Sequence, residues 1–107
     1  MNKVKDKLPA LVEEELAAAM EEHPLFASVH EGYAVTLEEV EEAEYELKCA
    51  RNALSWLWSG GVRHDDMAVA RSAACSIKEA AIDLAAEAIQ VAAMAQKLMA
   101  SIGAVTP

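Results

Sequence analysis

Apolar and polar residues alternate with the period of an α-helix in three stretches of the chain, at about residues 8–23, 29–58 and 67–102. Within each stretch apolar side chains recur every three or four positions, which places them on one face of a helix. No stretch shows the period-two alternation of a β-strand. The pattern therefore predicts an all-α protein, a bundle of three long helices, or of four if the third breaks near residues 72–76.

The side chains on these apolar faces are the ones expected in the core. In the first helix they are Leu8, Leu11, Val12, Leu16, Ala19 and Met20. In the second they are Tyr33, Leu37, Val40, Leu47, Leu54 and Leu57, and in the third Met94 and Met99 are predicted to fill the core.

Local signals mark where these helices begin and end. Helix-ending residues follow the three stretches: Pro24, Gly60, Gly61, Gly103 and Pro107. Ser28 and Glu31 fit the capping-box pattern at the start of the second helix, and Asp65 or Asp66 is expected to cap the third. Gly32 costs about 1 kcal/mol relative to alanine inside a helix, so the second helix begins either before or just after this glycine.

Length and composition indicate one modest domain. At 107 residues the chain is expected to form a single domain, residues 1–107, in which the charged residues 1–7 fray. Apolar residues make up 54% of the chain but aromatic residues only 5%, because much of the apolar share is alanine. Alanine favours helices and lets them approach closely, yet each alanine buries little area. We therefore expect the chain to gain stability by packing against further copies of itself.

The net charge and the two cysteines limit the classes of partner and the compartment that we expect. The net charge of −9 argues against a nucleic-acid polymer, because its phosphates would be repelled. A nucleotide is still compatible, since a cation can bridge its phosphates. The sequence has neither a recognisable signal peptide nor an uncharged run of membrane-spanning length. We therefore expect no membrane partner. Cys49 and Cys75 lie far apart without metal-ligand spacing, which favours free thiols in a cytoplasmic protein.

Six glutamates crowd the middle of the second helix, in Val35-Thr-Leu-Glu-Glu-Val-Glu-Glu-Ala-Glu-Tyr-Glu-Leu47. Glu39, Glu42 and Glu46 follow one another at spacings of three and four, so they share one side of the helix beside the apolar stripe. Like charges this close repel each other. Solvent, basic partners or a divalent cation are the candidates to offset the repulsion, and a solvated outer face is the usual outcome for such a run.

The third helix carries a second acidic segment. Glu79, Asp83, Glu87 and Gln90 are spaced by four, four and three among alanines. An outer polar stripe is an equally good interpretation of this segment alone. Two facing helices of this kind would collect oxygen ligands, which favours Mg²⁺, a hard cation that binds oxygens at about 2.0–2.1 Å. Zinc is disfavoured, because the three histidines lack ligand spacing.

These residues carry a resemblance to a known family. Glu38-Glu-Val-Glu-Glu42 matches the E-E-x-x-E motif of MazG-like all-α nucleoside-triphosphate pyrophosphohydrolases. The preceding His30-Glu-Gly-Tyr-Ala-Val-Thr-Leu37 resembles the H-E-G-Y-A-V-x-L segment of their phage and bacterial relatives. Glu87-Ala-Ile-Gln-Val-Ala-Ala-Met-Ala95 resembles their second motif, E-x-x-D, within E-A-x-Q-V-A-A-M-A. The resemblance covers about residues 10–102, and both motifs on consecutive helices are more specific than either alone.

The resemblance implies a homodimer or homotetramer of helical chains. Such proteins cleave a nucleoside triphosphate between its α- and β-phosphates, releasing the monophosphate and pyrophosphate. Glu39, Glu42 and Glu87 would be Mg²⁺ ligands, with Mn²⁺ as a substitute. Glu38 and Glu39 would be catalytic, Glu38 as a further ligand or as the group that activates the attacking water. Gln90 would take the position of the aspartate in the second motif.

The chain departs from the family pattern at Gln90, which is neutral where the family usually has aspartate. An amide oxygen still coordinates Mg²⁺ but brings no charge, so we expect weaker metal binding or a loss of catalysis. Asp83, one turn before Glu87, is our candidate for the missing charge.

Substrate contacts are less clearly marked. The candidate phosphate-facing cations are Lys48, Arg51, Arg71, Lys78 and Lys97, and any one of them fits an ordinary surface base better. Of these, Lys48 and Arg51 are our predicted phosphate contacts. Trp56 is predicted to stack on a nucleobase, although a core or interface position suits at least one of Trp56 and Trp58.

Two other functions compete with the hydrolase. Gln90 supports a non-catalytic helical homo-oligomer that retains the MazG-like scaffold around a degenerate metal site. A ferritin-like di-metal bundle would need Glu-x-x-His motifs on its helices, and the chain has none.

Overall fold

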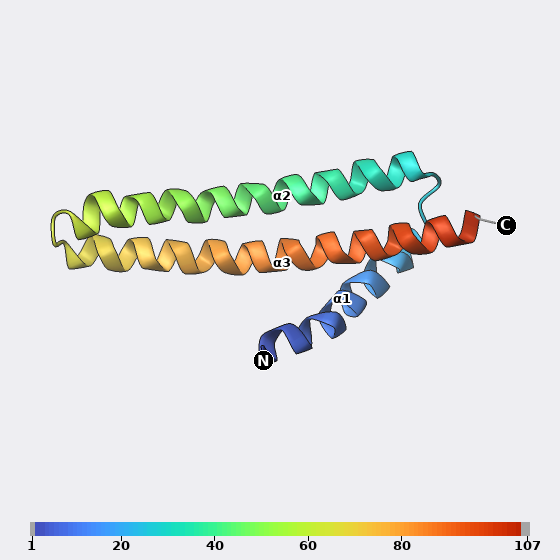
Figure 1. The fold of residues 1–107 in the computed structure, drawn as a ribbon, viewed down its shortest axis with the longest axis horizontal. Coiled ribbons are helices and arrows are strands. Elements are labelled where there is room, and N and C mark those ends of the chain that lie inside the picture. Colours follow the sequence, from blue (N-terminus) through green and yellow to red (C-terminus); the bar gives the residue numbers. More distant parts are fainter. Residues whose placement is uncertain (1, 106–107) are drawn as a thin grey trace. The chain divides into compact units, whose positions relative to one another are not determined.

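The computed structural model describes residues 2–105, which form three α-helices and no β-strand. Helix α1 spans Lys3–Glu22, α2 spans Val29–Trp56 and α3 spans Met67–Val105 (Figure 1). A π-helical turn, Leu57–Val62, follows α2. The predicted all-α class is therefore confirmed for this part of the chain.

The chain divides into two compact units, and the boundaries fall inside α2 and α3. The first unit contains α1, α2 up to Val40, and α3 from Glu87 onward; the second contains Glu41–Ala86.

In the first unit, side-chain and backbone contacts join all three helices. Leu16 of α1, Phe26 of the connection and Ala93 of α3 are buried. Gln96 Nε2 donates a hydrogen bond of 2.8 Å to Glu13 Oε1, which links α3 to α1. The Phe26 backbone N–H donates to Ser101 Oγ at 2.9 Å, so the connection between α1 and α2 is fixed to α3.

In the second unit, the end of α2 and the start of α3 run side by side in opposite directions (Figure 1). Small residues allow this close approach, since Ala53, Ala73 and Ala80 are buried. Gly61 is also buried, and a Cβ atom placed on it would lie only 3.0 Å from Ala70 Cα.

Helix α1 begins at Lys3 rather than at about residue 8. Asn2 caps it, because its Oδ1 accepts hydrogen bonds from the N–H groups of Val4 and Lys5 at 3.1 and 3.2 Å. A capping side chain stabilises a helix by roughly 1 kcal/mol. The charged residues 3–7 are consequently helical, which corrects the predicted start of the helix; Met1 lies outside the described residues.

The starts of the other two helices follow the predicted caps. Ser28 Oγ accepts the Glu31 N–H at 3.1 Å, and Glu31 Oε1 accepts the Ala27 N–H at 3.1 Å, one residue before the expected partner. Of the two aspartates before α3, Asp66 is the cap, since its Oδ1 accepts the Val69 N–H at 3.1 Å.

The predicted helix breaks are wrong at three places. Gly60 and Gly61 do not stop the helical winding, which continues as the π-helical turn to Val62. The chain reverses instead at Asp65, whose φ of 50° is left-handed, a conformation that aspartate tolerates better than most residues. Helix α3 runs without a break through residues 72–76 and through Gly103.

The predicted core of α1 agrees better with the structure than that of α2. On α1, Leu16 is buried and four of its predicted neighbours are half-buried, while Leu11 is exposed. On α2 the prediction is wrong for Tyr33, Leu37, Leu47 and Leu54, all of which are exposed. Met99 and both tryptophans are also exposed. Most of the large apolar side chains predicted for the α2 core thus remain on the surface of this single chain.

The structure also bears on the state of the cysteines and on the presence of membrane-spanning helices. Cys49 and Cys75 are free thiols, as predicted. Across residues 2–105, no helix has the length and apolar character needed to cross a membrane.

Substituting Gly61 with alanine is expected to lower the free energy of unfolding by about 1–3 kcal/mol, the usual cost of overpacking. The added Cβ would lie 3.0, 3.1 and 3.2 Å from the Cα, Cβ and N atoms of Ala70, and a backbone cannot yield as a side chain does. The matched control is Gly103→Ala, where nothing lies within 4 Å of the added atom. That change should leave stability equal or raise it by up to about 1 kcal/mol. Chemical denaturation of both variants is the measurement, and equal effects at the two glycines would contradict the packing described here.

Candidate metal site

Three of the predicted ligands come together in the structure. Glu39, Glu42 and Glu87 each offer one carboxylate oxygen, and these oxygens all lie within 4.8 Å of one another. Glu39 and Glu42 are one turn apart on α2, and Glu87 comes from α3. Glu39 and Glu87 are half-buried and Glu42 is exposed. The Oε2 atoms of Glu39 and Glu87 are buried from solvent. We call these three residues the acidic triad.

The acidic triad suits a small hard cation. Two oxygens on opposite sides of one Mg²⁺ are about 4 Å apart, twice the metal–oxygen distance, so a spread of up to 4.8 Å needs little rearrangement. Three carboxylates this close repel one another, and bringing them out of water makes the repulsion stronger. A divalent cation would offset that repulsion and would leave coordination positions for water or phosphate oxygens.

A pocket of about 370 Å³ opens beside Glu39 in the first unit. Its lining comes from all three helices: Glu15, Ala18, Ala19, Glu22, Glu39, Gln90 and Met94. The pocket therefore combines three carboxyl groups with one amide. Space lined in this way is suited to a hydrated cation and the polar end of a ligand.

Glu15 and Glu22 are two further acidic residues of this site that were not predicted from the sequence. Both lie on α1, seven residues apart, with Ala18 and Ala19 between them. This is the same pattern of acidic residues among alanines that marked the segment around Glu87. The pattern was a usable signal, but only the packing of α1 reveals that it faces Glu39.

The remaining predicted ligands differ in their positions. Gln90 lines the pocket together with Glu39, which is a member of the acidic triad, and its role as a ligand stays a prediction. Glu38 is exposed and is not part of the acidic triad. Asp83 is also exposed and outside the triad, and it belongs to the second unit. Its proposed compensation for Gln90 stays a prediction.

The predicted substrate contacts Lys48, Arg51 and Trp56 are all exposed residues of the second unit. Arg51 lines a groove of about 310 Å³ together with Leu47, Ala50, Leu54 and Ile77. The roles of these three residues in substrate binding stay predictions. Among the candidate cations, Lys97 differs from the others because the structure buries it, with an exposed fraction of 5%.

Comparison of the chain with protein-family models, with curated proteins and with solved structures found no match.

Proposed function

We propose that this protein is a Mg²⁺-dependent nucleoside triphosphate pyrophosphohydrolase of the MazG-like type. The observation that supports this most is the acidic triad, in which residues of the E-E-x-x-E segment on α2 and the E-x-x-Q segment on α3 share one small volume. Both the pattern of two acidic helical segments and the motif resemblance predicted that pairing of segments.

The residues suggest a division of roles. Glu39, Glu42 and Glu87 would hold the cation, with the Gln90 amide as a neutral neighbour. When bound, Mg²⁺ neutralises phosphate charge and lowers the pKa of a bound water. Mn²⁺ takes the same oxygen ligands and is the expected substitute.

The reaction is a hydrolysis of the bond between the α- and β-phosphates. A water oxygen bonds to the α-phosphorus while the bond to the bridging oxygen breaks, and that electron pair leaves with pyrophosphate. Glu38, at the exposed edge of the motif, would accept the proton that the water releases. The pocket beside Glu39 would hold the reacting group in place, and positioning accounts for much of such catalysis.

The direct test is pyrophosphate release from a panel of common and modified nucleoside triphosphates, with Mg²⁺, with Mn²⁺ and with a chelator. We expect pyrophosphate and nucleoside monophosphate in equal amounts, only when a divalent cation is present. The preferred nucleotide would identify the substrate. Release of inorganic phosphate instead, or no release from any nucleotide by a folded chain, would contradict the proposal.

A second candidate is a non-catalytic homo-oligomer built on the same scaffold. Gln90 supports it, because the site has one negative charge fewer than the family pattern. The two candidates differ in their response to metal. A cation that binds only the folded chain must raise the thermal midpoint, whereas a degenerate site would leave the midpoint unchanged in Mg²⁺.

Both candidates include assembly into a homodimer or homotetramer. The exposed apolar residues of α2 support this, since Leu47 and Leu54 are 52% and 57% exposed and line one groove. A second copy of the chain offers the apolar surface that would cover them. Neither candidate involves a nucleic-acid polymer or a membrane.

A further inference from the structure

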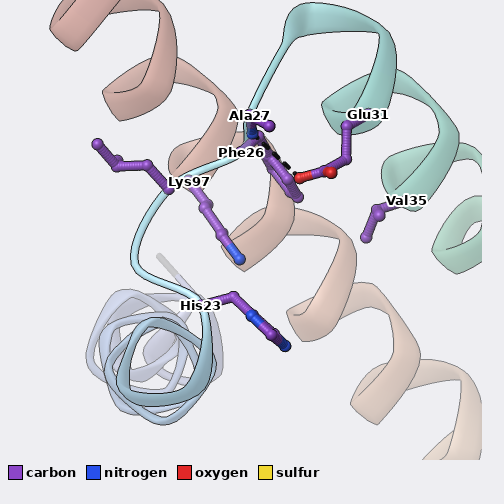
Figure 2. A pocket seen from close by; sticks show the side chains of 7 residues that line it. His23, Phe26, Ala27, Glu31, Val35 and Lys97 are labelled. Carbon is purple, nitrogen blue, oxygen red and sulfur yellow. Dashed lines mark hydrogen bonds between the residues drawn. The ribbon is translucent and has the colours of Figure 1, made fainter.

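A second pocket, of about 570 Å³, lies where the connection between α1 and α2 meets α3 (Figure 2). It is lined by His23, Leu25, Phe26, Ala27, Glu31, Val35 and Lys97. None of these residues lines the pocket beside Glu39. Its volume is within the range of about 300–1,000 Å³ that is usual for small-molecule sites.

Lys97 is the feature that distinguishes this pocket. Its exposed fraction is 5%, yet the residue lines the pocket, and its Nζ atom lies 4.4 Å from the centre of the Phe26 ring. In Figure 2 the amino end of Lys97 points toward His23. Ser101 Oγ accepts the Phe26 N–H and donates to the Lys97 carbonyl at 2.8 Å, so the Lys97–Phe26 pair is held in position.

The Lys97 ammonium has no carboxylate partner among the described residues; the partner that the structure gives it is the Phe26 ring. Glu31 is the acidic residue of the pocket, but its Oε1 accepts the Ala27 N–H at 3.1 Å (Figure 2). A buried charge is costly unless an opposite charge compensates it. The chain has a net charge of −9, so a buried cation without an acidic partner is unusual here.

We propose that this pocket binds a small organic anion, a phosphate ester or a carboxylate. Its anionic group contacts Lys97 Nζ, and its apolar body lies against Leu25, Phe26 and Val35. Lysine binds phosphate and carboxylate as a compact point charge, so one contact serves both kinds of anion. The proposal is independent of the hydrolase, because this site needs neither a divalent cation nor the acidic triad.

Titration of the full chain with phenyl phosphate and with benzoate, in EDTA, tests the proposal. Calorimetry or chemical shifts should show saturable binding of at least one probe, and the stronger probe tells whether the ligand is a phosphate or a carboxylate. Inorganic phosphate should compete, and binding should weaken as salt is raised. No saturable binding of either probe to the folded chain would overturn the proposal.

Three variants assign the binding to Lys97. Lys97→Gln should weaken probe binding at least tenfold, while Lys78→Gln, an exposed lysine on the same helix, should leave it unchanged. Glu31→Gln should tighten binding several-fold, because it removes a repelling charge and keeps an oxygen for the Ala27 N–H. This last variant changes an exposed residue, so it tests the site even if Lys97→Gln unfolds. Equal affinity in all variants would assign the binding elsewhere and overturn the proposal.

The outcome of the probe titration is distinguishable from the outcome of the pyrophosphate-release assay. Phenyl phosphate and benzoate have no α–β phosphate bond, and EDTA removes the cation. Loss of nucleotide hydrolysis in every assay would leave probe binding at Lys97 intact, and failure of probe binding would leave the hydrolase proposal standing.

Discussion

Replacing Glu39 with glutamine is expected to lower pyrophosphate release by about 100-fold or more, the size of the loss when one preorganised electrostatic interaction is removed from an active site. Glu39 is the member of the acidic triad that also lines the pocket with Gln90. The substitution keeps the shape of the side chain and removes its charge. The cation would then be held by two carboxylates, Glu42 and Glu87.

The same change should not weaken the folded chain in the absence of metal. Removing one of three clustered carboxylates relieves repulsion, so the thermal midpoint in EDTA should stay the same or rise. The increase in midpoint on adding Mg²⁺, expected for the parent chain, should shrink or disappear. An unchanged or higher midpoint in EDTA together with a smaller Mg²⁺ shift would show that Glu39 acts in metal binding and not in folding.

Glu41→Gln is the matched control. Glu41 occupies a variable position of the E-E-x-x-E segment, is exposed, and is not part of the acidic triad. The control changes the net charge by the same amount on the same helix. Activity in this variant should stay within about twofold of the parent, since surface substitutions of this kind have small effects. A hundredfold loss in both variants, or in neither, would contradict the role assigned to Glu39.

The helices were predictable from the sequence because their signals are local. The apolar period gave three helices, and Ser28 and Asp66 gave two of their starts. The predicted helix ends are wrong where a contact with another residue decides whether the helix continues. Asn2 extends α1 through residues that look too charged to be ordered. Gly61 looks like a stop, but it allows close packing against Ala70 and the winding continues.

The candidate site was only partly predictable, because local spacing fixes some of its residues and tertiary packing fixes the others. Spacing places Glu39 and Glu42 on one side of α2, and the motif resemblance pairs them with Glu87, which the structure brings within reach. Spacing does not say which face α1 presents, so Glu15 and Glu22 were missed. Nor does it distinguish Lys97, which is buried beside Phe26, from the other lysines. Tertiary packing, which no local pattern encodes, sets both.

The exposed apolar groove on α2 is the surface through which we expect two copies of the chain to associate. Leu47, Ala50 and Leu54 are spaced by three and four, so they share one face of α2, and they line the groove together with Ile77 of α3. Covering a leucine in an interface is worth at least about 1.5 kcal/mol. In a two-fold symmetric dimer each such contact occurs twice, which gives about 3 kcal/mol, or about a hundredfold in the dissociation constant.

Leu54→Glu should therefore raise the dissociation constant of the expected oligomer by about a hundredfold or more, because it removes both contacts and brings a charge into the apolar interface. Sedimentation or light scattering over a range of protein concentrations is the measurement. Asn52→Glu is the matched control: it is exposed on the same helix, two residues away and so on another face, and it adds the same charge. If Leu54→Glu and Asn52→Glu dissociate equally, net charge drives the effect and the groove is not the interface. If the parent chain is monomeric at every concentration, the expectation of self-assembly fails, and the apolar face of α2 is left to a partner of another kind.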